Sequence, residues 1–244
     1  METNVSYKLV PSFRTSFGTG WQVMQDNFLR LLLIIIILAV IATPFKLMDF
    51  DFDLSDIPGK WEGDLKDLIG LGAIGLLAGF FAMIGILYAF LVAPVFKFGG
   101  DLIFVQSVRK VRPEFEVLIK GFSENYLHIV LANLLVFALI ILGLFALIIP
   151  GIIIACRLIF VSYIIMDKKL DPIEAVELSW KLTRGHGWSI FFMGVASFFI
   201  LIFGLCLLIV GIFPAMMWIA SSFATLYQSV LIEKEKPADV QVAV

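Results

Sequence analysis

The chain has 244 residues, of which 61% are hydrophobic and 16% are charged, with 18 basic and 20 acidic residues. Soluble domains are roughly 45–50% apolar and about 25% charged, and one soluble core of this length cannot bury the excess apolar surface. The near-neutral charge argues against a nucleic-acid partner, and two cysteines are too few for a disulfide-stapled secreted module. The composition therefore predicts a polytopic integral membrane protein.

A helix that crosses the ~30 Å hydrocarbon core needs about 20 mostly apolar residues. On this scale the sequence predicts six transmembrane helices, at residues 29–44, 68–95, 126–149, 151–166, 188–210 and 212–232. Pro150–Gly151 and residues 211–214 interrupt the apolar C-terminal half without a polar loop, which predicts two tight hairpin turns. The first segment is short enough to resemble a signal peptide, but 28 residues precede it, so we expect it to be retained.

The basic residues of the connections predict the orientation, since Lys and Arg favour the cytoplasmic side. One set of connections carries fourteen of them and the opposite set carries three, at Lys46, Lys60 and Lys66. We therefore expect both termini in the cytoplasm and one membrane domain over residues 1–232. An acidic outer loop at residues 45–67 and a short cytoplasmic tail at residues 233–244 complete the predicted topology.

A short amphipathic helix is predicted before the first, third and fifth segments. Apolar residues recur there at steps of three or four: Phe13, Phe17, Trp21, Met24 and Phe28, then Phe115, Leu118, Ile119 and Phe122, then Ile173, Val176 and Trp180. Asp171 and Pro172 resemble an N-cap and first helical position of the third helix, and Gly185 its C-terminal stop.

Aromatic rings with a polar neighbour or a polar end suit the boundary between water and lipid. The predicted interfacial anchors are Trp21, Phe28, Tyr126, Trp180 and Trp188. The sequence thus predicts an all-α membrane fold of three units, each a cytoplasmic amphipathic interfacial helix followed by a transmembrane hairpin.

Arg157 is the one ionic residue predicted to lie well inside a segment. It follows Gly151 by six residues, which places it roughly 9 Å below the outer end at 1.5 Å per residue. A charge at such depth is costly and marks a functional site by default. Two interpretations stay open: a structural Arg that ties the hairpin to its neighbours, or a contact with a lipid or other ligand. The expected partners are carbonyls near Pro150, a lipid phosphate, or acids of the outer loop.

Other polar and small residues are weaker candidates for contacts inside the membrane. Asn133 and Ser197 are expected to hydrogen-bond between helices, or else to touch a ligand or lipid. Gly75 and Gly79 form a G-x-x-x-G pattern, which favours close helix packing within the chain or between protomers. Pro150–Gly151 is expected to serve packing at the hairpin turn.

The residues that usually carry metal or nucleophilic chemistry are sparse. His128 and His186 are the two histidines, and neither has the Cys or paired carboxylates of a metal site. No nucleophile with an orienting acid accompanies them, and Cys156 and Cys206 lie in separate segments. We expect no metal, no cofactor and no catalytic activity.

The stretch from Ile148 to Tyr227 carries a series of short motifs: P-G-I, R-x-x-F, an acidic turn, E-A, S-W-x-L-T and G-H-x-W. They lie at Pro150, Gly151, Arg157, Phe160, Asp167, Glu174, Ala175, Ser179, Trp180, Leu182, Thr183, Gly185, His186 and Trp188, with Ala224 and Tyr227 further on. This stretch resembles bacterial inner-membrane proteins related to the membrane domain of glycerophosphoryl diester phosphodiesterase. The resemblance implies an inner-membrane location and a membrane module without the soluble catalytic domain.

Two functions remain open at this point. The first is a non-enzymatic membrane module that scaffolds partners or shapes the bilayer through its interfacial helices. The alternative is a small transporter or lipid-handling protein whose Arg157 contacts an anionic headgroup or solute. Expected partners are membrane lipids and other membrane or cytoplasmic proteins, with the oligomeric state open. A polar cavity around Arg157 that reaches one membrane face would favour the alternative.

Overall fold

The computed structural model describes residues 7, 9–42, 65–111, 115–207 and 211–235, and the elements within them are α-helices. Five of these helices are long and apolar enough to cross a membrane, or up to six if a bent pair forms one span. The bent pair is α1 with α2, at 96°. These findings confirm an all-α membrane protein. Most of the predicted acidic loop and the predicted tail lie outside the described residues.

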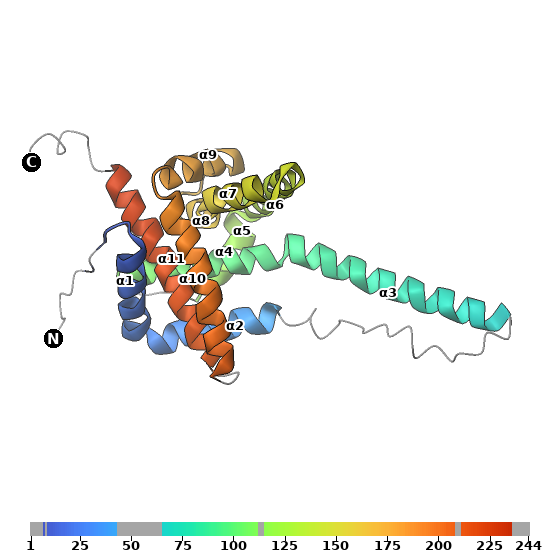
Figure 1. The fold of residues 1–244 in the computed structure, drawn as a ribbon. Helices are drawn as coiled ribbons and strands as arrows, with labels where there is room; N and C mark the ends of the chain where they lie inside the picture. Colours follow the sequence, from blue (N-terminus) through green and yellow to red (C-terminus); the bar gives the residue numbers. More distant parts are fainter. Residues whose placement is uncertain (1–6, 8, 43–64, 112–114, 208–210, 236–244) are drawn as a thin grey trace, which may run out of the picture.

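The helices repeat one order three times along the chain (Figure 1). In each unit a short helix leads into an outgoing helix, and one or two return helices follow. The first unit consists of α1 (Phe13–Asp26), α2 (Phe28–Ala42), α3 (Leu65–Leu91) and α4 (Ala93–Val108). The second consists of α5 (Val117–Glu124), α6 (Tyr126–Ala146), α7 (Ile148–Leu158) and α8 (Val161–Lys168). The third consists of α9 (Pro172–Thr183), α10 (Gly187–Cys206) and α11 (Ile212–Glu235).

A backbone feature marks the start of the second and third units. Lys110 and Lys169 have φ angles of 57° and 51° and are the non-glycine residues with positive φ in the described chain. Each stands just after a return helix and three residues before a proline, in the sequences K-V-R-P at 110–113 and K-L-D-P at 169–172. Residues 8–11 read K-L-V-P ahead of α1. The similar sequence at all three places, with the positive φ at Lys110 and Lys169, supports the three-unit interpretation.

The core lies where the return helices meet. Helix α4 packs against both α8 and α11, and Phe104, Phe160 and Tyr227 are almost completely buried there. The sequence prediction ended the second segment at Val95 and assigned the next residues to a cytoplasmic connection. That assignment was wrong, because α4 continues to Val108 as a buried helix.

Two glycines inside α4 explain why this helix was mistaken for a connection. Glycine inside a helix costs about 1 kcal/mol relative to alanine. Here a Cβ at Gly99 would lie 2.9 Å from the Cα of Leu118 in α5, and one at Gly100 would lie 2.8 Å from Cδ1 of Leu38 in α2. The glycines therefore permit α5 and α2 to pack directly on α4.

The turn of the second hairpin lies earlier than predicted. Helix α6 ends at Ala146 and Leu147 is extended, so Pro150 falls in the first turn of α7. Proline is tolerated there because the N–H that it lacks would have no intrahelical partner. Gly151 is buried, and a Cβ on it would lie 2.6 Å from Cδ2 of Leu144. Helices α6 and α7 are thus in close contact at this glycine.

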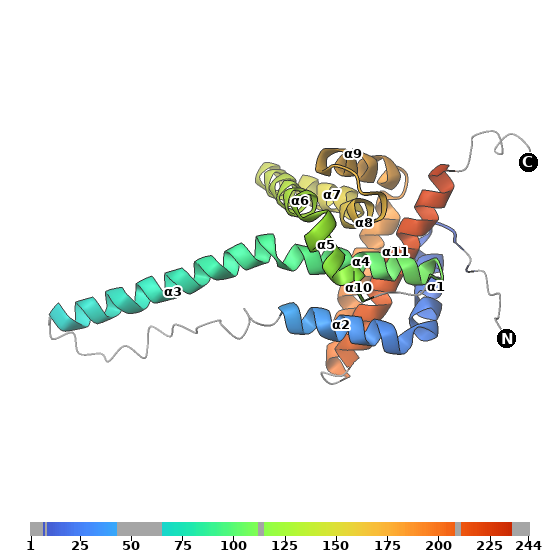
Figure 2. The ribbon, with the colours of Figure 1, turned by 180° about the vertical axis from the view of Figure 1, so that it is seen from behind.

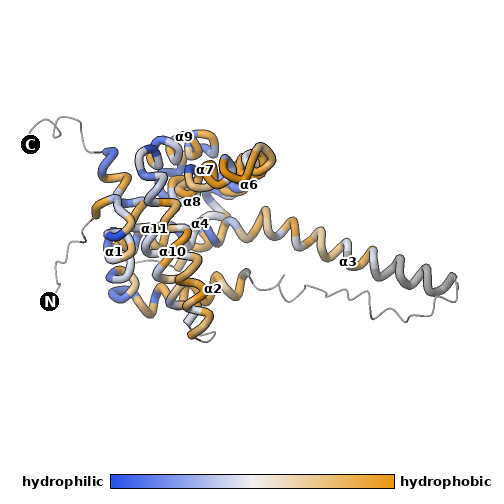
Figure 3. Tube along the Cα trace, viewed as in Figure 1, coloured by the Kyte–Doolittle hydropathy of each residue, from blue (hydrophilic) through white to orange (hydrophobic). Residues whose placement is uncertain are grey.

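Helix α3 projects away from the other helices in both views (Figures 1 and 2), and Figure 3 shows that the coloured part of it is largely apolar. Leu76, Phe80 and Leu87 are exposed on it. Gly75 and Gly79 are also exposed, with open space where a Cβ would stand. The packing within the chain that the sequence predicted for this glycine pair is therefore absent from the described residues, and the pair faces outward.

The predicted apolar stripes of the three short helices are only partly buried within the chain. In α1, Phe17 and Met24 are buried whereas Trp21 is exposed. In α9 the buried residues are Ala175, Ser179, Leu182 and Thr183, not the predicted stripe of Ile173, Val176 and Trp180. The hydroxyls of Ser179 and Thr183 are hydrogen-bonded, which removes the cost of burying them. Ile173 and Trp180 of the predicted stripe are exposed.

Candidate functional site

Arg157 lies at the C-terminal end of α7, beside the junction between α9 and α10. Helix α7 ends at Leu158, and α8 begins at Val161 after a short break. The side chain therefore shares a cavity with Gly185 and Gly187, at the junction that the sequence predicts at the cytoplasmic boundary. Residues 148–168 together form one candidate membrane span, so the predicted depth of Arg157 below the outer end stays a prediction.

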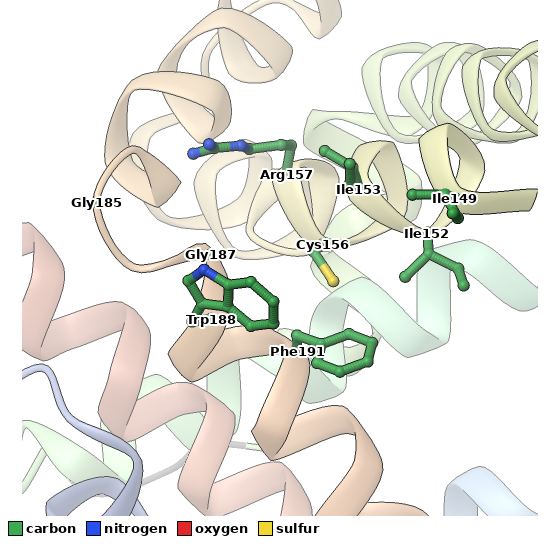
Figure 4. A pocket seen from close by; sticks show the side chains of 9 residues that line it. All are labelled: Ile149, Ile152, Ile153, Cys156, Arg157, Gly185, Gly187, Trp188 and Phe191. Carbon is green, nitrogen blue, oxygen red and sulfur yellow. The ribbon is translucent and has the colours of Figure 1, made fainter.

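A cavity of about 590 Å³ opens between α7 and α10 (Figure 4). This volume is within the range of roughly 300–1,000 Å³ that is common for small-molecule sites. Arg157 extends toward the loop at Gly185, while Trp188 and Phe191 face α7 from α10. The lining residues are Ile149, Ile152, Ile153, Cys156, Arg157, Gly185, Gly187, Trp188 and Phe191.

A second cavity of about 530 Å³ continues along the same two helices. It shares Ile152, Cys156 and Phe191 with the first cavity. Its other lining residues are all apolar or glycine: Ala155, Ile159, Ile190, Gly194, Val195, Phe198 and Phe199. We refer to the two cavities together as the α7–α10 groove. Among the described residues that line it, Arg157 is the single charged one.

Helix α9 holds the end of α7 in place through Ser179 and Thr183. Ser179 Oγ donates a hydrogen bond of 2.7 Å to the backbone carbonyl of Arg157, and Thr183 Oγ1 lies 3.5 Å from the same oxygen. A carbonyl in the last turn of a helix has no intrahelical partner, so the hydroxyl of Ser179 satisfies it. The position of the arginine backbone is thus set by the S-W-x-L-T motif.

The guanidinium of Arg157 lies over an aromatic ring and keeps an unused donor. Its Cζ is 5.8 Å from the ring centre of Trp180, a cation–π geometry. Nη1 is buried and has no hydrogen-bond partner among the described residues, so the carbonyls near Pro150 do not satisfy it as predicted. An unpaired buried donor costs about 1–3 kcal/mol, and more on a charged group. An anion in the cavity would remove this cost.

A network of polar side chains at the ends of the return helices was missed by the sequence prediction. Arg109 donates to both carboxylate oxygens of Asp167, at 2.5 and 2.7 Å, and through Nε to Gln228 at 2.7 Å. Tyr227 donates to Asp167 at 3.0 Å. We call these four residues the base network. It joins the ends of α4, α8 and α11, one return helix from each unit.

The charge on Arg109 is well compensated. Burial alone would lower the pKa of its guanidinium, but the hydrogen bonds and the charge of Asp167 outweigh burial and raise that pKa. Lys97 and Asp101 on α4 also fall within a candidate membrane span, Gly75–Val108. Asp101 accepts a hydrogen bond from Ser162 of α8. Arg157 is therefore not the one ionic residue within a span, but its Nη1 lacks a partner.

The motifs of the family resemblance come together in space. Phe160 and Tyr227 have ring centres 5.5 Å apart, and Tyr227 bonds Asp167. Ser179 bonds the Arg157 carbonyl, and Trp180 lies against its guanidinium. The sequence analysis used these residues only as a mark of family resemblance. In the structure they form one connected framework, and the α7–α10 groove lies on one side of it. No signal local to the sequence revealed this, since the contacts join separate helices.

Of the remaining candidate residues, Trp188 lines the groove, whereas Asn133, Ser197, Phe28 and Tyr126 do not. Asn133 is half-buried on α6. Ser197 is buried on α10, where Oγ donates to the carbonyl of Met193 in the same helix at 2.7 Å rather than across helices. Trp188 is 76% exposed at the groove mouth, whereas Phe28 on α2 is 40% exposed and Tyr126 on α6 is half-buried.

Histidines and cysteines of the described chain do not gather into a metal site. No group of three or more His, Cys, Asp or Glu that could hold a metal ion exists within the described ranges. His128 pairs with Asp171 at 2.9 Å and His186 with Glu233 at 3.5 Å. The His128 pair therefore links the second unit to the third, and the His186 pair links two parts of the third unit.

Comparison with known proteins yields no match to a protein-family model, a curated protein or a solved structure. The family resemblance of residues 148–227 therefore stays a prediction from the sequence.

Proposed function

We propose that this protein binds an anionic amphiphile, a membrane lipid, in the α7–α10 groove, with the headgroup at Arg157 and the apolar part along the two helices. The observation that carries the proposal is the unpartnered, buried Nη1 of Arg157 at the end of a long apolar groove. The cavity is mostly apolar rather than the polar one that the sequence analysis named as a criterion. Of the two functions left open by the sequence, an apolar groove with one charge favours lipid handling over scaffolding.

The groove is polar at one end and apolar along its length, as an amphiphile requires. Ile149 is 72% exposed and Phe198 and Phe199 are 62% exposed, so the apolar walls stand open to the surroundings of the helices. In a bilayer these surroundings are acyl chains. A lipid can therefore enter sideways from the membrane, without crossing water.

Arg157 belongs to a candidate membrane span, Ile148–Lys168, and in the proposed topology a headgroup would reach it at the N-terminus of α10. Arg157 neighbours Gly187 and Trp188 at the start of α10, where the sequence predicts the cytoplasmic boundary of a bacterial inner membrane. A charge is less costly at that level than in the bilayer centre. The exposed Ile119 of α5 and Ile173 of α9 would lie in the same interface as parts of amphipathic helices.

Lipid retention by charge variants tests the proposal. The full chain is placed in nanodiscs of equal parts phosphatidylcholine and phosphatidylglycerol, extracted in mild detergent, and analysed for bound lipid by native mass spectrometry. The Arg157→Gln variant should retain about tenfold less phosphatidylglycerol than the wild type, equivalent to ~1.4 kcal/mol of binding free energy. Arg184→Gln removes an exposed arginine outside the groove lining and should retain it.

A second pair of variants tests the groove itself. Ile152 lines both cavities, so Ile152→Trp should fill the groove and reduce binding of all lipids. Leu142→Trp adds the same ring at an exposed position of α6 and should have no effect. Equal lipid retention in the wild type, Arg157→Gln and Ile152→Trp would overturn the proposal.

A further inference from the structure

The groove mouth has donors on both of its walls. Arg157, whose Nη1 is unpaired, lines the cavity from α7, and Gly187 and Trp188, the first residues of α10, line the same cavity (Figure 4). The first N–H groups of a helix have no intrahelical partners, and the helix dipole gives that end a partial positive charge. The two walls therefore combine a cation with a helix N-terminus.

No side chain caps the N-terminus of α10. The N-cap residue is His186, and it makes no side-chain hydrogen bond to the helix. Its ring instead pairs with Glu233 of α11 at 3.5 Å. Helices α4 to α9 likewise start without a side-chain cap, whereas Ser12 accepts a hydrogen bond from Thr15 N–H at the start of α1. The donors at the start of α10 are thus left for another acceptor, at the place where Arg157 also lacks one.

Space and charge at the mouth favour an anion. A Cβ at Gly187 would have no atom within 4 Å, and the same holds at Gly185. No carboxylate is among the described residues that line the cavity. An anion between α7 and α10 would therefore meet donors on two sides and no like charge in the lining.

From this arrangement we infer that the headgroup held at Arg157 is a phosphate, bound between the guanidinium and the N-terminus of α10. The inference rests on the proposed function and names its ligand class. A phosphate has oxygens arranged tetrahedrally, so it accepts from two opposite walls at once, whereas a carboxylate has two oxygens in one plane. Helix N-termini are established phosphate sites, and Arg binds phosphate through directed hydrogen bonds.

Ligands that share one acyl chain but differ in headgroup test whether the bound headgroup is a phosphate. Binding of myristoyl lysophosphatidic acid, myristate, myristoyl lysophosphatidylcholine and inorganic phosphate to the full chain in mild detergent is measured by native mass spectrometry. Lysophosphatidic acid should bind about tenfold more tightly than myristate, ~1.4 kcal/mol. The phosphocholine ligand should lie between them, because its cation offsets the phosphate charge. Competition by inorganic phosphate at matched concentration would identify free phosphate as the ligand, and failure to compete at large excess would identify the lipid.

A substitution at the helix start supplies a matched pair of variants. Gly187→Asp puts a carboxylate at the mouth in the open space beside α10, and Gly187→Asn puts a neutral group of the same size there. A carboxylate at this position suits the helix dipole, so the Asp variant should fold. Gly187→Asp should weaken lysophosphatidic acid binding at least tenfold, and Gly187→Asn should leave it within about twofold.

The outcomes separate this inference from the proposed function. Equal affinity for lysophosphatidic acid and myristate, or equal effects of the Asp and Asn variants, would overturn the inference of a phosphate headgroup. The proposal of amphiphile binding would still stand. If no ligand binds more weakly to Arg157→Gln than to the wild type, both proposals fall.

Discussion

Two arginines at the ends of return helices meet opposite surroundings. Arg109 follows α4 and gives three donor groups to Asp167 and Gln228. Arg157 lies in the last turn of α7, rests on Trp180, and leaves Nη1 without a partner among the described residues. Both positions suit a cation because of the helix dipole. The difference teaches that Arg109 serves the architecture, whereas the unpaired Nη1 of Arg157 supports the proposal that this residue binds a ligand.

The largest effect should come from breaking the base network. Asp167→Asn leaves Arg109 partly buried without its countercharge. We expect a loss of about 2–4 kcal/mol, less than the ~3–5 kcal/mol of a fully buried pair because the Arg109 side chain is 31% exposed. SDS-induced unfolding followed by circular dichroism measures it. Arg157→Gln should change stability by no more than about 0.5 kcal/mol; equal destabilisation by both variants would remove the distinction.

A smaller loss of stability is expected when the link from α9 to Arg157 is cut. Ser179→Ala removes the hydrogen bond to the Arg157 carbonyl and should cost about 1 kcal/mol, since that buried acceptor loses its partner. Ser123→Ala is the control, because Ser123 bonds the Lys120 carbonyl at an exposed site. The same unfolding assay applies, and identical midpoints for Ser179→Ala and Ser123→Ala would contradict the role of Ser179.

The smallest effect concerns the ring beneath Arg157. Trp180→Leu removes the cation–π contact, worth about 0.5–1 kcal/mol at a partly exposed site, so binding of phosphatidylglycerol should weaken about two- to fivefold. Trp180→Phe should weaken phosphatidylglycerol binding less than Trp180→Leu does, because a ring remains. Trp21→Leu removes an exposed ring of α1 and serves as control. Affinity from titration in nanodiscs gives the comparison, and unchanged affinity in Trp180→Leu would exclude the ring from the site.

Hydropathy and capping patterns predicted those features of the fold that depend on residues close together in the sequence. The apolar segments correspond to helices, and Asp171–Pro172 leads into α9. Gly185, the predicted helix stop, has a φ of 97°, a conformation open to glycine at little cost. Arg157 was selected because a charge among apolar residues is costly wherever it lies.

The predictions that failed concern contacts between residues that are far apart in the sequence. Arg109 and Asp167 are 58 residues apart, and nothing near either one predicts the other. Helix α4 was missed because Lys97 and the pair Gly99–Gly100 resemble the end of a helix, while its neighbours α2 and α5 require those glycines. The cavity beside Arg157 depends on the break after α7 and on the fold of α9 over it, and neither is visible in hydropathy.

The base network can form only in a fixed order during synthesis of the protein. Arg109 and Asp167 belong to the first and second units, and Tyr227 and Gln228 to the last helix. During synthesis from the N-terminus, Arg109 stays without a countercharge until α8 emerges, and the network closes only with α11. The groove acquires its second wall, α10, between these two events. A nascent chain therefore cannot close the network around an incomplete site.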